Sequence, residues 1–458
     1  MCMNSSLYIA DTLVTMNPGN DVLCDSAVLV ERGVIVDIGP RDVLVGRNPH
    51  AEVVQLENCL LMPGLINTHC HSGLLRGTAE GLPVWDWLQQ YIDPMHRVLL
   101  PEEAALASRL CYAEALLSGT TTIVDMWRYM HGSAIAAKEL GIRSMLVPYV
   151  AEHPDHDYFE TLYTNEALIK EWHGEAQGRI NVWVGLEHLF YAEPNALTRI
   201  SDLCRDYQVG FHTHSNESRF DVETTLKRYS ARPIEVLEQK GLLAAPNTLL
   251  AHCVWLDDLE IEILRNHNVG VAHNPISNMK LASGAARVTD MLAKNISVGL
   301  GTDGEKENNN LDMFEEMKSA SLLAKLNAED AAALDAWDVC RMATINGARA
   351  LGIDDEVGSL EVGKKADMIA IRTNTPRMTP LIRSGKYLNL HHNLVHAVQG
   401  GDVAMTIVDG HVLVADGKLQ TANLGEIIEE ACRAIQPLLE RRDRWIERSG
   451  LSINELDQ

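Results

Sequence analysis

Two histidines one residue apart, His69 and His71, are the residues of this sequence that most directly indicate chemistry. They end an apolar run, residues 61–71, that breaks at Pro63-Gly64 and then resumes. Side chains two apart on a strand point to the same face, so the two imidazoles converge. Such a pair is half of a metal site, and later segments must supply the remaining ligands. Taken alone, the pair could equally be two ordinary polar residues at a strand end.

Candidates for the remaining ligands recur at the ends of later predicted strands. His214, His252 and Asp303 each end such a run. A single strand-end histidine is more often a satisfied polar residue, but recurrence at several strand ends is not easily accidental. Three or more imidazoles with a carboxylate suit zinc or iron and leave a position open for water. A water bound there becomes hydroxide near neutral pH.

These side chains need a scaffold that gathers strand ends at one point. From Pro63 to about Leu351, short β-rich runs alternate with longer amphipathic stretches, a pattern typical of an α/β fold of the (β/α)8 TIM-barrel type. In that fold, reactive groups lie at the C-terminal ends of the strands. Pro101 to Leu117 is predicted to be helical. The predicted strands cover residues 61–71, 119–126, 143–149, 180–186, 209–214, 248–252, 269–273 and 296–303.

The two chain ends carry a different pattern of short β-type runs and turn signals. We predict that they build one small β-sandwich domain, with the barrel inserted between its parts. The stretch from Leu424 to Trp445 is amphipathic and is predicted to form a helix that packs on the barrel or on a neighbouring subunit. The predicted boundaries are 1–62 and 366–420 for the sandwich, 63–365 for the catalytic barrel and 421–458 for the helical tail.

The composition of the chain indicates which kinds of binding partner and which cell compartment are expected. The 458 residues include 39 basic and 63 acidic side chains, and the formal charge of −24 disfavours a nucleic-acid partner. No signal peptide and no apolar run long enough to span a membrane is expected. Nine scattered cysteines without a C-x-x-C pair indicate reduced thiols, mostly small buried hydrophobes, in a cytoplasmic protein.

Several longer motifs are spread over nearly the whole chain. One set covers residues 63–71, 358–367 and 408–412, and a second covers 211–217, 251–256, 272–284, 301–304 and 308–317. The first set resembles the amidohydrolase superfamily. The second is similar to its deaminase and triazine-hydrolase branch, and most of all to S-adenosylhomocysteine/5'-methylthioadenosine deaminases.

The resemblance implies that His69, His71, His214 and Asp303 hold one divalent metal ion, zinc with iron or manganese as alternatives. Two-metal members of the superfamily place a bridging lysine at the end of the fourth strand. The corresponding run, residues 182–186, carries none, which favours a single metal.

The resemblance also implies the reaction, which is hydrolytic release of ammonia from an amino-substituted N-heteroaromatic ring such as an adenosine-type nucleoside, purine, pterin or triazine. Glu217 would protonate a ring nitrogen that attack leaves electron-rich. His252 would contact the attacking water or the developing oxyanion, and Asp303 would pass a proton from the water to departing ammonia. A surface carboxylate is the alternative interpretation of Glu217.

The predicted substrate contacts are Asp86 on ribose hydroxyls, His188 on the ring and Trp85 in an aromatic pocket wall, although core packing is as good an explanation for Trp85 and Trp87. No arginine lies between residues 143 and 179, where relatives bind the amino-acid tail of S-adenosylhomocysteine. The resemblance therefore leaves that substrate in doubt.

Where relatives usually carry small residues, this chain has Glu305-Lys306-Glu307, which indicates either altered specificity or a salt-bridged loop. Two other functions remain open. One is a triazine-type or amide hydrolase with chloride, an alkylamine or an acyl amide as its target, and the other is a non-catalytic scaffold. The resemblance further implies a small-molecule substrate and a homo-oligomer, a dimer or higher.

Overall fold

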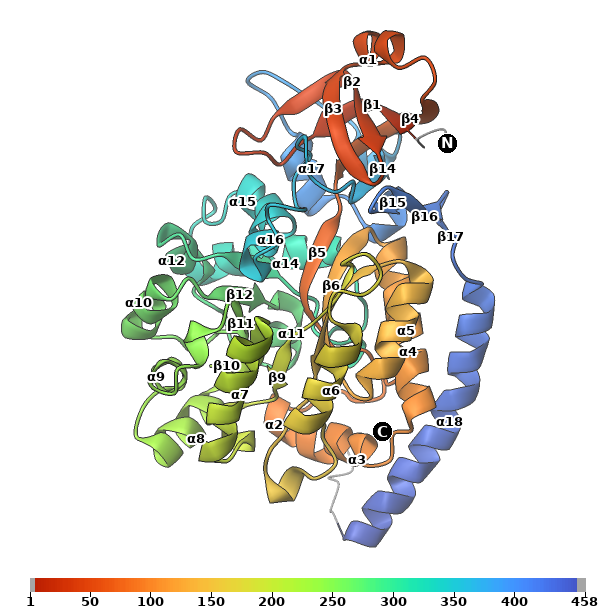
Figure 1. The fold of residues 1–458 in the computed structure, drawn as a ribbon. Helices are drawn as coiled ribbons and strands as arrows, with labels where there is room; N and C mark the ends of the chain where they lie inside the picture. Colours follow the sequence, from red (N-terminus) through yellow and green to blue (C-terminus); the bar gives the residue numbers. More distant parts are fainter. Residues whose placement is uncertain (1–4, 451–458) are drawn as a thin grey trace.

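The computed structural model describes residues 5–450, which form two sheets and the helices that cover them. Figure 1 shows the smaller sheet above the larger one, with the two chain ends contributing to the smaller. The barrel lies between them in the sequence, as predicted. Cys2 and the end of the predicted tail lie outside the described residues.

The larger sheet is a closed parallel barrel. Each strand pairs with the next in chain order except that β8 does not pair with β9, and β13 pairs with β5. The short strands β8 and β9 pair with β7 and β10 respectively, so together they fill the fourth of eight positions and confirm the (β/α)8 prediction. The strands are β5 (Leu65–Cys70), β6 (Thr120–Trp127), β7 (Arg143–Pro148), β8 (Ile180–Val182), β9 (Val184–Leu186), β10 (Phe211–Ser215), β11 (Thr248–His252), β12 (Gly270–His273) and β13 (Val298–Leu300).

The fourth strand, predicted as one run, is interrupted at Trp183. The side chain of Asn165 explains the interruption: its Nδ2 donates to the Trp183 carbonyl at 3.1 Å, and its Oδ1 accepts from Gly185 N at 3.0 Å. The Asn165 amide takes the place of the hydrogen bonds that a neighbouring strand would otherwise make, so the buried backbone stays hydrogen-bonded where the strand is interrupted.

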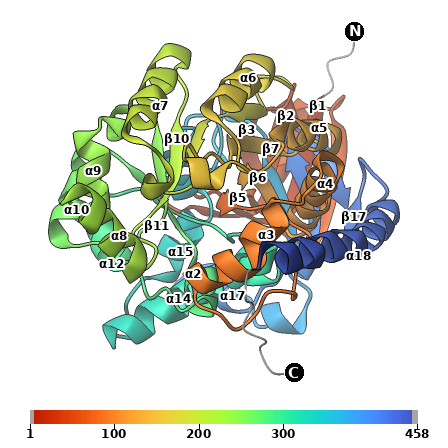
Figure 2. The ribbon, with the colours of Figure 1, turned by 90° about the horizontal axis from the view of Figure 1, so that it is seen from below.

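Helices surround the barrel (Figures 1 and 2). The predicted helix Pro101–Leu117 is confirmed as α4. The others around the barrel are α5 (Met130–Leu140), α6 (Leu162–Trp172), α7 (Pro194–Tyr207), α8 (Arg219–Tyr229), α9 (Pro233–Gln239), α10 (Asp258–Asn266), α11 (Pro275–Lys280), α12 (Val288–Ala293), α13 (Glu305–Asn308), α14 (Met313–Ala328), α15 (Ala336–Met342) and α16 (Ile345–Leu351).

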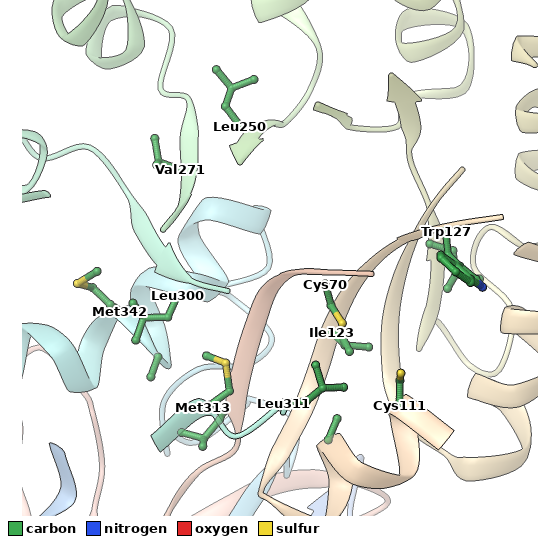
Figure 3. Packing of buried hydrophobic residues seen from close by; sticks show 14 of the residues in the cluster. Cys70, Cys111, Ile123, Trp127, Leu250, Val271, Leu300, Leu311, Met313 and Met342 are labelled. Atoms are coloured by element: carbon green, nitrogen blue, oxygen red, sulfur yellow. The ribbon is translucent and has the colours of Figure 1, made fainter. Parts of the chain in front are cut away.

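The barrel core is apolar between strands and helices. Figure 3 shows strand residues such as Ile123 and Leu300 near helix residues such as Cys111 and Met342, all of them buried. This packing supplies most of the driving force for folding, because burial removes apolar surface from water. Of the described cysteines, six are buried and two, Cys24 and Cys432, are exposed, and all are free thiols.

The smaller sheet joins both chain ends, as predicted. Strand β14 pairs antiparallel with β4, and this pairing links the two parts into one continuous mixed sheet of order β17-β16-β15-β14-β4-β1-β2-β3. Side chains from both parts share one apolar cluster. The elements are β1 (Ser5–Val14), β2 (Val22–Glu31), β3 (Val34–Pro40), α1 (Arg41–Arg47), β4 (Glu52–Pro63), β14 (Met368–Arg372), β15 (Val403–Val408), β16 (His411–Ala415) and β17 (Lys418–Leu419).

The chain crosses from one sheet to the other at Gly64. Strand β4 ends at Pro63 and β5 begins at Leu65. A Cβ at Gly64 would lie 2.1 Å from Oγ1 of Thr121, so only glycine lets the crossing pass this close to β6. The crossing points β5 away from the small sheet, and its C-terminal end carries the two histidines to the opposite end of the barrel.

Three further segments complete the fold. Figure 2 looks onto the barrel end that faces away from the small sheet, where α2 (Val84–Trp87), a π-helical turn (Leu88–Ile92) and α3 (Asp93–His96) lie. The tail forms α18 (Leu424–Ser449), which packs along α4 as the prediction allowed, and α17 (Leu390–His396) packs against α14 and α15. None of the described helices combines the length and apolar character that crossing a bilayer requires.

Candidate active site and metal centre

The four predicted metal ligands converge at the C-terminal ends of β5, β10 and β13. Asp303 Oδ1 lies 3.4 Å from His69 Nε2 and 3.3 Å from His71 Nε2, and the Nε2 atoms of His71 and His214 lie 3.1 Å apart. All four side chains are buried. Residues that are up to 234 positions apart in the sequence therefore meet within one coordination sphere.

The outer nitrogens of the three imidazoles are held in place by hydrogen bonds. His71 and His214 donate from Nδ1 to backbone carbonyls, those of Met126 at 2.6 Å and Glu187 at 2.7 Å. His69 donates from Nδ1 to His212 Nε2 at 2.8 Å, because His212 itself donates from Nδ1 to a carbonyl. Each ligand therefore presents an unprotonated Nε2 to the centre, as metal-binding histidines do.

This arrangement fits a cation. Burial lowers the pKa values of His71 and His214 well below their usual range, so both rings are neutral at physiological pH. Two neutral rings whose Nδ1 atoms donate outward place two lone pairs 3.1 Å apart, which is repulsive unless a cation lies between them. Within the described residues, His69 Nε2 has no hydrogen-bond partner. The donor set of three nitrogens and one carboxylate suits a divalent metal.

The backbone at two strand ends is strained in a way that aims the side chains inward. His252 and Asp303 have φ of 70° and 59°, in the left-handed region that non-glycine residues rarely adopt. Such residues cost on the order of 1–3 kcal/mol and concentrate at functional sites. Asp303 is further fixed by Ser277, whose Oγ donates to Oδ2 at 2.6 Å, and by Gly304 N, which donates to Oδ1 at 3.0 Å.

Glu217, the predicted acid, lies at the edge of this cluster and is buried, which argues against the surface-carboxylate alternative. Its Oε1 lies 3.9 Å from His252 Nε2, and its Oε2 lies 3.7 Å from His188 Nε2. His252 donates from Nδ1 to Asn278 Oδ1 at 2.9 Å and lies 3.8 Å from Asp303. The structure thus brings the three predicted catalytic residues together.

His188 differs electrostatically from the ligand histidines. Burial opposes its charge, but Glu187, whose Oε2 lies 2.6 Å from Nδ1, raises the pKa of His188 to about 10. His188 is therefore an imidazolium at neutral pH. Its Nε2 has no hydrogen-bond partner among the described residues and lies on the wall of the cavity.

The cluster adjoins a small cavity of about 20 Å³, far below the roughly 300–1,000 Å³ of ligand pockets. Val84, Trp87 and Leu88 contribute to its lining, so α2 and the π-helical turn close the barrel mouth over the metal ligands. Water is largely excluded from such a space, which strengthens electrostatic interactions inside it.

The predicted substrate contacts other than His188 fall outside this lining. Asp86 is exposed on α2, and its ribose role stays a prediction. Trp85 lies beside the cavity: its ring centroid is 5.0 Å from that of His188, and its Nε1 donates to Ser218 Oγ at 2.7 Å. Trp87, for which core packing was an equal explanation, is both buried in the core and part of the lining.

The three charged residues after β13 are all buried on the short helix α13, and an ion pair between two of them agrees with the salt-bridged alternative. Lys306 Nζ lies 3.0 Å from Glu307 Oε1, while Glu305 accepts from Leu75 N at 3.0 Å. Burial raises the pKa of Glu307, and the adjacent Lys306 ammonium opposes that rise by favouring the charged carboxylate. Glu307 alone of the three lines the cavity, facing His71 and Asp303.

Sequence reasoning missed several residues of the site. Glu187 directly follows the fourth predicted strand. Searching the end of that strand for polar residues, as at the other strand ends, would have found it. Tyr149 ends the third predicted strand and donates to Glu187 Oε1 at 3.2 Å. His212 shares a strand face with His214, two residues away, but nothing in the sequence shows that it supports His69 rather than binding metal.

The comparisons with known proteins agree with this geometry. The sequence pattern of the amidohydrolase family matches residues 60–413. The chain is 37% identical over 447 residues to the 5'-deoxyadenosine deaminase of Methanobrevibacter smithii, with 95% of this chain and 99% of the relative covered. It is 38% identical over 439 residues to the 5-methylthioadenosine/S-adenosylhomocysteine deaminase of Desulforudis audaxviator, with the same coverage. The chain belongs to the amidohydrolase family.

Solved structures extend the likeness to three dimensions. An adenosine deaminase of Xanthomonas campestris with bound zinc matches with a TM-score of 0.86 at 29% identity, covering 96% of this chain and 98% of that one. An atrazine chlorohydrolase of Arthrobacter aurescens, complexed with zinc, matches with a TM-score of 0.84 at 23% identity, covering 93% and 99%, and so shows the fold alone. The protein is a hydrolase that acts on C–N bonds, and the relatives favour deamination over the alternative leaving groups.

Proposed function

We propose that this enzyme hydrolytically deaminates adenosine-type nucleosides whose 5' substituent is small and uncharged, such as 5'-deoxyadenosine. The observation that carries the proposal is the pair of facing Nε2 lone pairs of His71 and His214, with the buried acid Glu217 beside the same cluster. The two deaminase relatives, each aligned over nearly their full length, support the substrate class.

His69, His71, His214 and Asp303 would hold a divalent metal ion, for which we propose zinc. When bound, such an ion acidifies a water so that it attacks carbon at neutral pH. The role of the protein is then to hold the reacting groups in place. Ser277 and Gly304 fix the carboxylate of Asp303, so that it can accept a proton from the attacking water and deliver it to the departing amine.

Glu217 would supply the second proton transfer. When the amino-bearing ring carbon is attacked, electrons move onto the neighbouring ring nitrogen, which would be left anionic unless it were protonated. A carboxylic acid beside that nitrogen removes the charge as it develops. His252, oriented by Asn278, would contact the attacking water or the oxygen that develops negative charge.

His188 would bind another acceptor of the ring. Because Glu187 keeps it protonated, its Nε2 carries a hydrogen and can donate into the cavity. A purine offers unprotonated ring nitrogens as acceptors. The Glu187–His188 pair would therefore orient the ring while Glu217 acts on the nitrogen next to the reacting carbon.

The mouth of the site favours an uncharged 5' group. The ring centroids of Phe190 and Phe220 lie 5.2 Å and 4.8 Å from that of Trp85, which forms an aromatic surface beside His188. Arg219, an exposed cation near this surface, lies over the Trp255 ring at 4.4 Å. Aromatic rings suit a methyl or methylthio group, whereas a zwitterionic amino-acid tail requires charged partners.

Ammonia release by the metal-loaded enzyme tests the proposal. The substrates are 5'-deoxyadenosine, 5'-methylthioadenosine, adenosine, S-adenosylhomocysteine, guanine, a pterin and melamine. We expect the first two to have the highest kcat/KM. Equal turnover of S-adenosylhomocysteine would refute the limit on charge but not deamination, and activity confined to the free bases would refute the nucleoside assignment.

The remaining assignments are proposals of the same kind. Asp86→Ala should raise KM for nucleosides and leave kcat unchanged if Asp86 reaches the ribose, and an unchanged KM would remove that role.

Elemental analysis of the protein purified from its native source would distinguish zinc from iron or manganese. We also propose a cytoplasmic homo-oligomer, a dimer or higher, that binds no nucleic acid. Light scattering and a nucleic-acid binding assay would test these two properties.

A further inference from the structure

The proposed mechanism leaves one buried carboxylate of the site without a role. Glu307 lines the cavity, and one of its oxygens lies within 4.8 Å of ligand atoms of both His71 and Asp303. It is 4% exposed. Burying a carboxylate costs free energy that a small apolar residue at this position would avoid. A purely structural role therefore explains the position of Glu307 poorly.

Lys306 holds Glu307 in place and leaves it able to bind something else. The ammonium lies 3.0 Å from Oε1 and 3.2 Å from Oε2, and it is itself buried over the Trp127 ring. A carboxylate has about four lone-pair sites, so a single donor does not saturate it. Glu305, on the same short helix, accepts from Leu75 N instead and does not line the cavity.

The two carboxyl groups of the cavity approach the metal ligands from different sides. Glu217 follows β10 and faces His252 and His188, whereas Glu307 follows β13, the neighbour of β5 in the ring. Strand β10 lies three positions from β13 around the barrel, so the two carboxyl groups start from different sides of it. A substrate over the metal ligands would therefore lie between the two carboxyl groups.

The chemistry of the substrate then assigns a partner to each of them. The reacting carbon of an aminopurine carries two nitrogens, the ring nitrogen and the exocyclic amine, which diverge by about 120° as at any trigonal carbon. When the ring nitrogen faces Glu217, the amine faces the other side. We propose that Glu307 accepts a hydrogen bond from the leaving amino group and so selects amino over halide or ether leaving groups. The inference rests on the proposed deaminase function.

The selection would act by repulsion as well as by attraction. Chlorine or a methoxy oxygen at the same carbon has no N–H to donate and presents lone pairs to the carboxylate. An acceptor that faces an acceptor in a buried site disfavours the wrong ligand. Glu307 would thus distinguish this chain from enzymes of the same fold that displace chloride.

Kinetics with matched substrates test the assignment. Metal-loaded wild type, Glu307→Gln and the control Glu305→Gln are compared on 5'-deoxyadenosine and on its 6-chloro counterpart. We expect Glu307→Gln to lower kcat/KM for the amino substrate by about 10- to 100-fold, as for a lost charged hydrogen bond, and to leave kcat/KM for the chloro substrate unchanged or raised, because the repelling charge is gone. The control should be within about threefold on both. Equal losses on both substrates, or no loss on either, would overturn the inference.

Binding gives a second readout that does not depend on turnover. In 1-deaza nucleosides, carbon replaces the ring nitrogen that Glu217 would protonate, so they bind without reacting. Glu307→Gln should weaken inhibition by the 6-amino analogue by about tenfold and leave the analogue without the amino group unchanged. Equal weakening of both, or loss of metal from the variant, would overturn the role. Wild type that deaminates no adenosine-type nucleoside would refute the proposed function itself.

Discussion

Two buried charged clusters lie at opposite ends of the barrel, and they differ in how completely their groups are paired. Where the barrel meets the small sheet, Arg143 donates to both oxygens of Asp367, at 2.8 Å and 3.1 Å, and Asp409 N donates to the same carboxylate at 2.7 Å. At the other end, His69 Nε2 and His188 Nε2 have no hydrogen-bond partner in the described part of the chain. In the first cluster, which joins two domains, each carboxylate faces a cation: even Asp409 Oδ1, which accepts no hydrogen bond among the described residues, lies 3.6 Å from Lys365 Nζ. This cluster is closed. The second cluster gathers lone pairs that no cation of the described chain neutralises, and so is open toward a ligand.

The comparison shows that burial of charged residues is not enough to identify a functional site. Both clusters are buried and charged, so burial does not distinguish a structural from a functional role. Pairing does, because a bidentate arginine–carboxylate pair satisfies itself, whereas converging lone pairs require a cation. Left-handed backbone does not distinguish the clusters, since Asp409 in the closed one has φ of 53°, as His252 and Asp303 have positive φ in the open one.

The largest expected effect is loss of the metal. His69→Ala or Asp303→Ala removes one of four ligands, so we expect the metal-to-chain ratio to fall from about one to near zero and turnover to fall below detection. Elemental analysis of the purified variants measures the ratio. A normal ratio together with normal turnover would show that the open cluster is not the metal site.

The next effect separates chemistry from binding. Glu217→Gln keeps the shape of the side chain but removes the acid, so kcat should fall by about 10²- to 10⁴-fold while the metal-to-chain ratio stays unchanged. Steady-state kinetics and elemental analysis on one preparation measure both quantities. Full activity in this variant would remove the acid from the mechanism.

A substitution in the closed cluster should lower the stability of the protein and leave its metal content unchanged. Arg143→Met leaves the buried Asp367 without its cation, and breaking a buried pair of this kind costs about 3–5 kcal/mol of unfolding free energy. The folded variant should retain its metal. Denaturant unfolding measures the loss, and the double variant with Asp367→Leu should recover part of it. If Arg143→Met had wild-type stability but reduced metal content, the closed cluster would not have the structural role that we assign to it.

The smallest effect is a pH dependence that arises in the open cluster. The pKa of His188 lies at about 10, above the ordinary imidazole value of 6.5. The folded state therefore binds this proton more tightly, so the stabilisation is complete below pH 6.5 and is lost as the pH rises through about 10. Between pH 7 and pH 9 we expect the unfolding free energy of metal-free protein to fall by about 2.5 kcal/mol from this group.

Glu187→Gln is the control for this effect, since it removes the carboxylate that raises the pKa. Unfolding of metal-free wild type and variant, followed at matched pH values, should give a flatter profile for the variant. Parallel profiles would mean that Glu187 does not keep His188 charged.

Much of the fold could be predicted because its signals are local. The helix Pro101–Leu117 has its proline at the first position, and the periodicity of the barrel strands is continuous in the sequence. The joining of both chain ends also followed from similar turn chemistry. The interruption at Trp183 could not be predicted, because its cause is Asn165, a side chain from a neighbouring helix.

The site residues also divide into those with a local sequence signal and those whose role depends on distant contacts. The residues that we propose as metal ligands could be found in the sequence because each ends a predicted strand, and parallel strand ends meet at one face of a barrel. The roles of Glu187 and Glu307 depend on which atoms approach them, and the sequence carries no signal for that. Asp86, inferred from resemblance alone, lies outside the cavity lining, and its ribose role stays a prediction.

The most direct test of the whole account is hydrolysis of 5'-deoxyadenosine in water enriched in oxygen-18. The metal-loaded wild-type enzyme should release one equivalent of ammonia per product, and mass spectrometry should find one labelled oxygen at the carbon that carried the amino group. Absence of ammonia from every adenosine-type nucleoside, with the metal-to-chain ratio near one, would contradict the assignment of this site as a nucleoside deaminase.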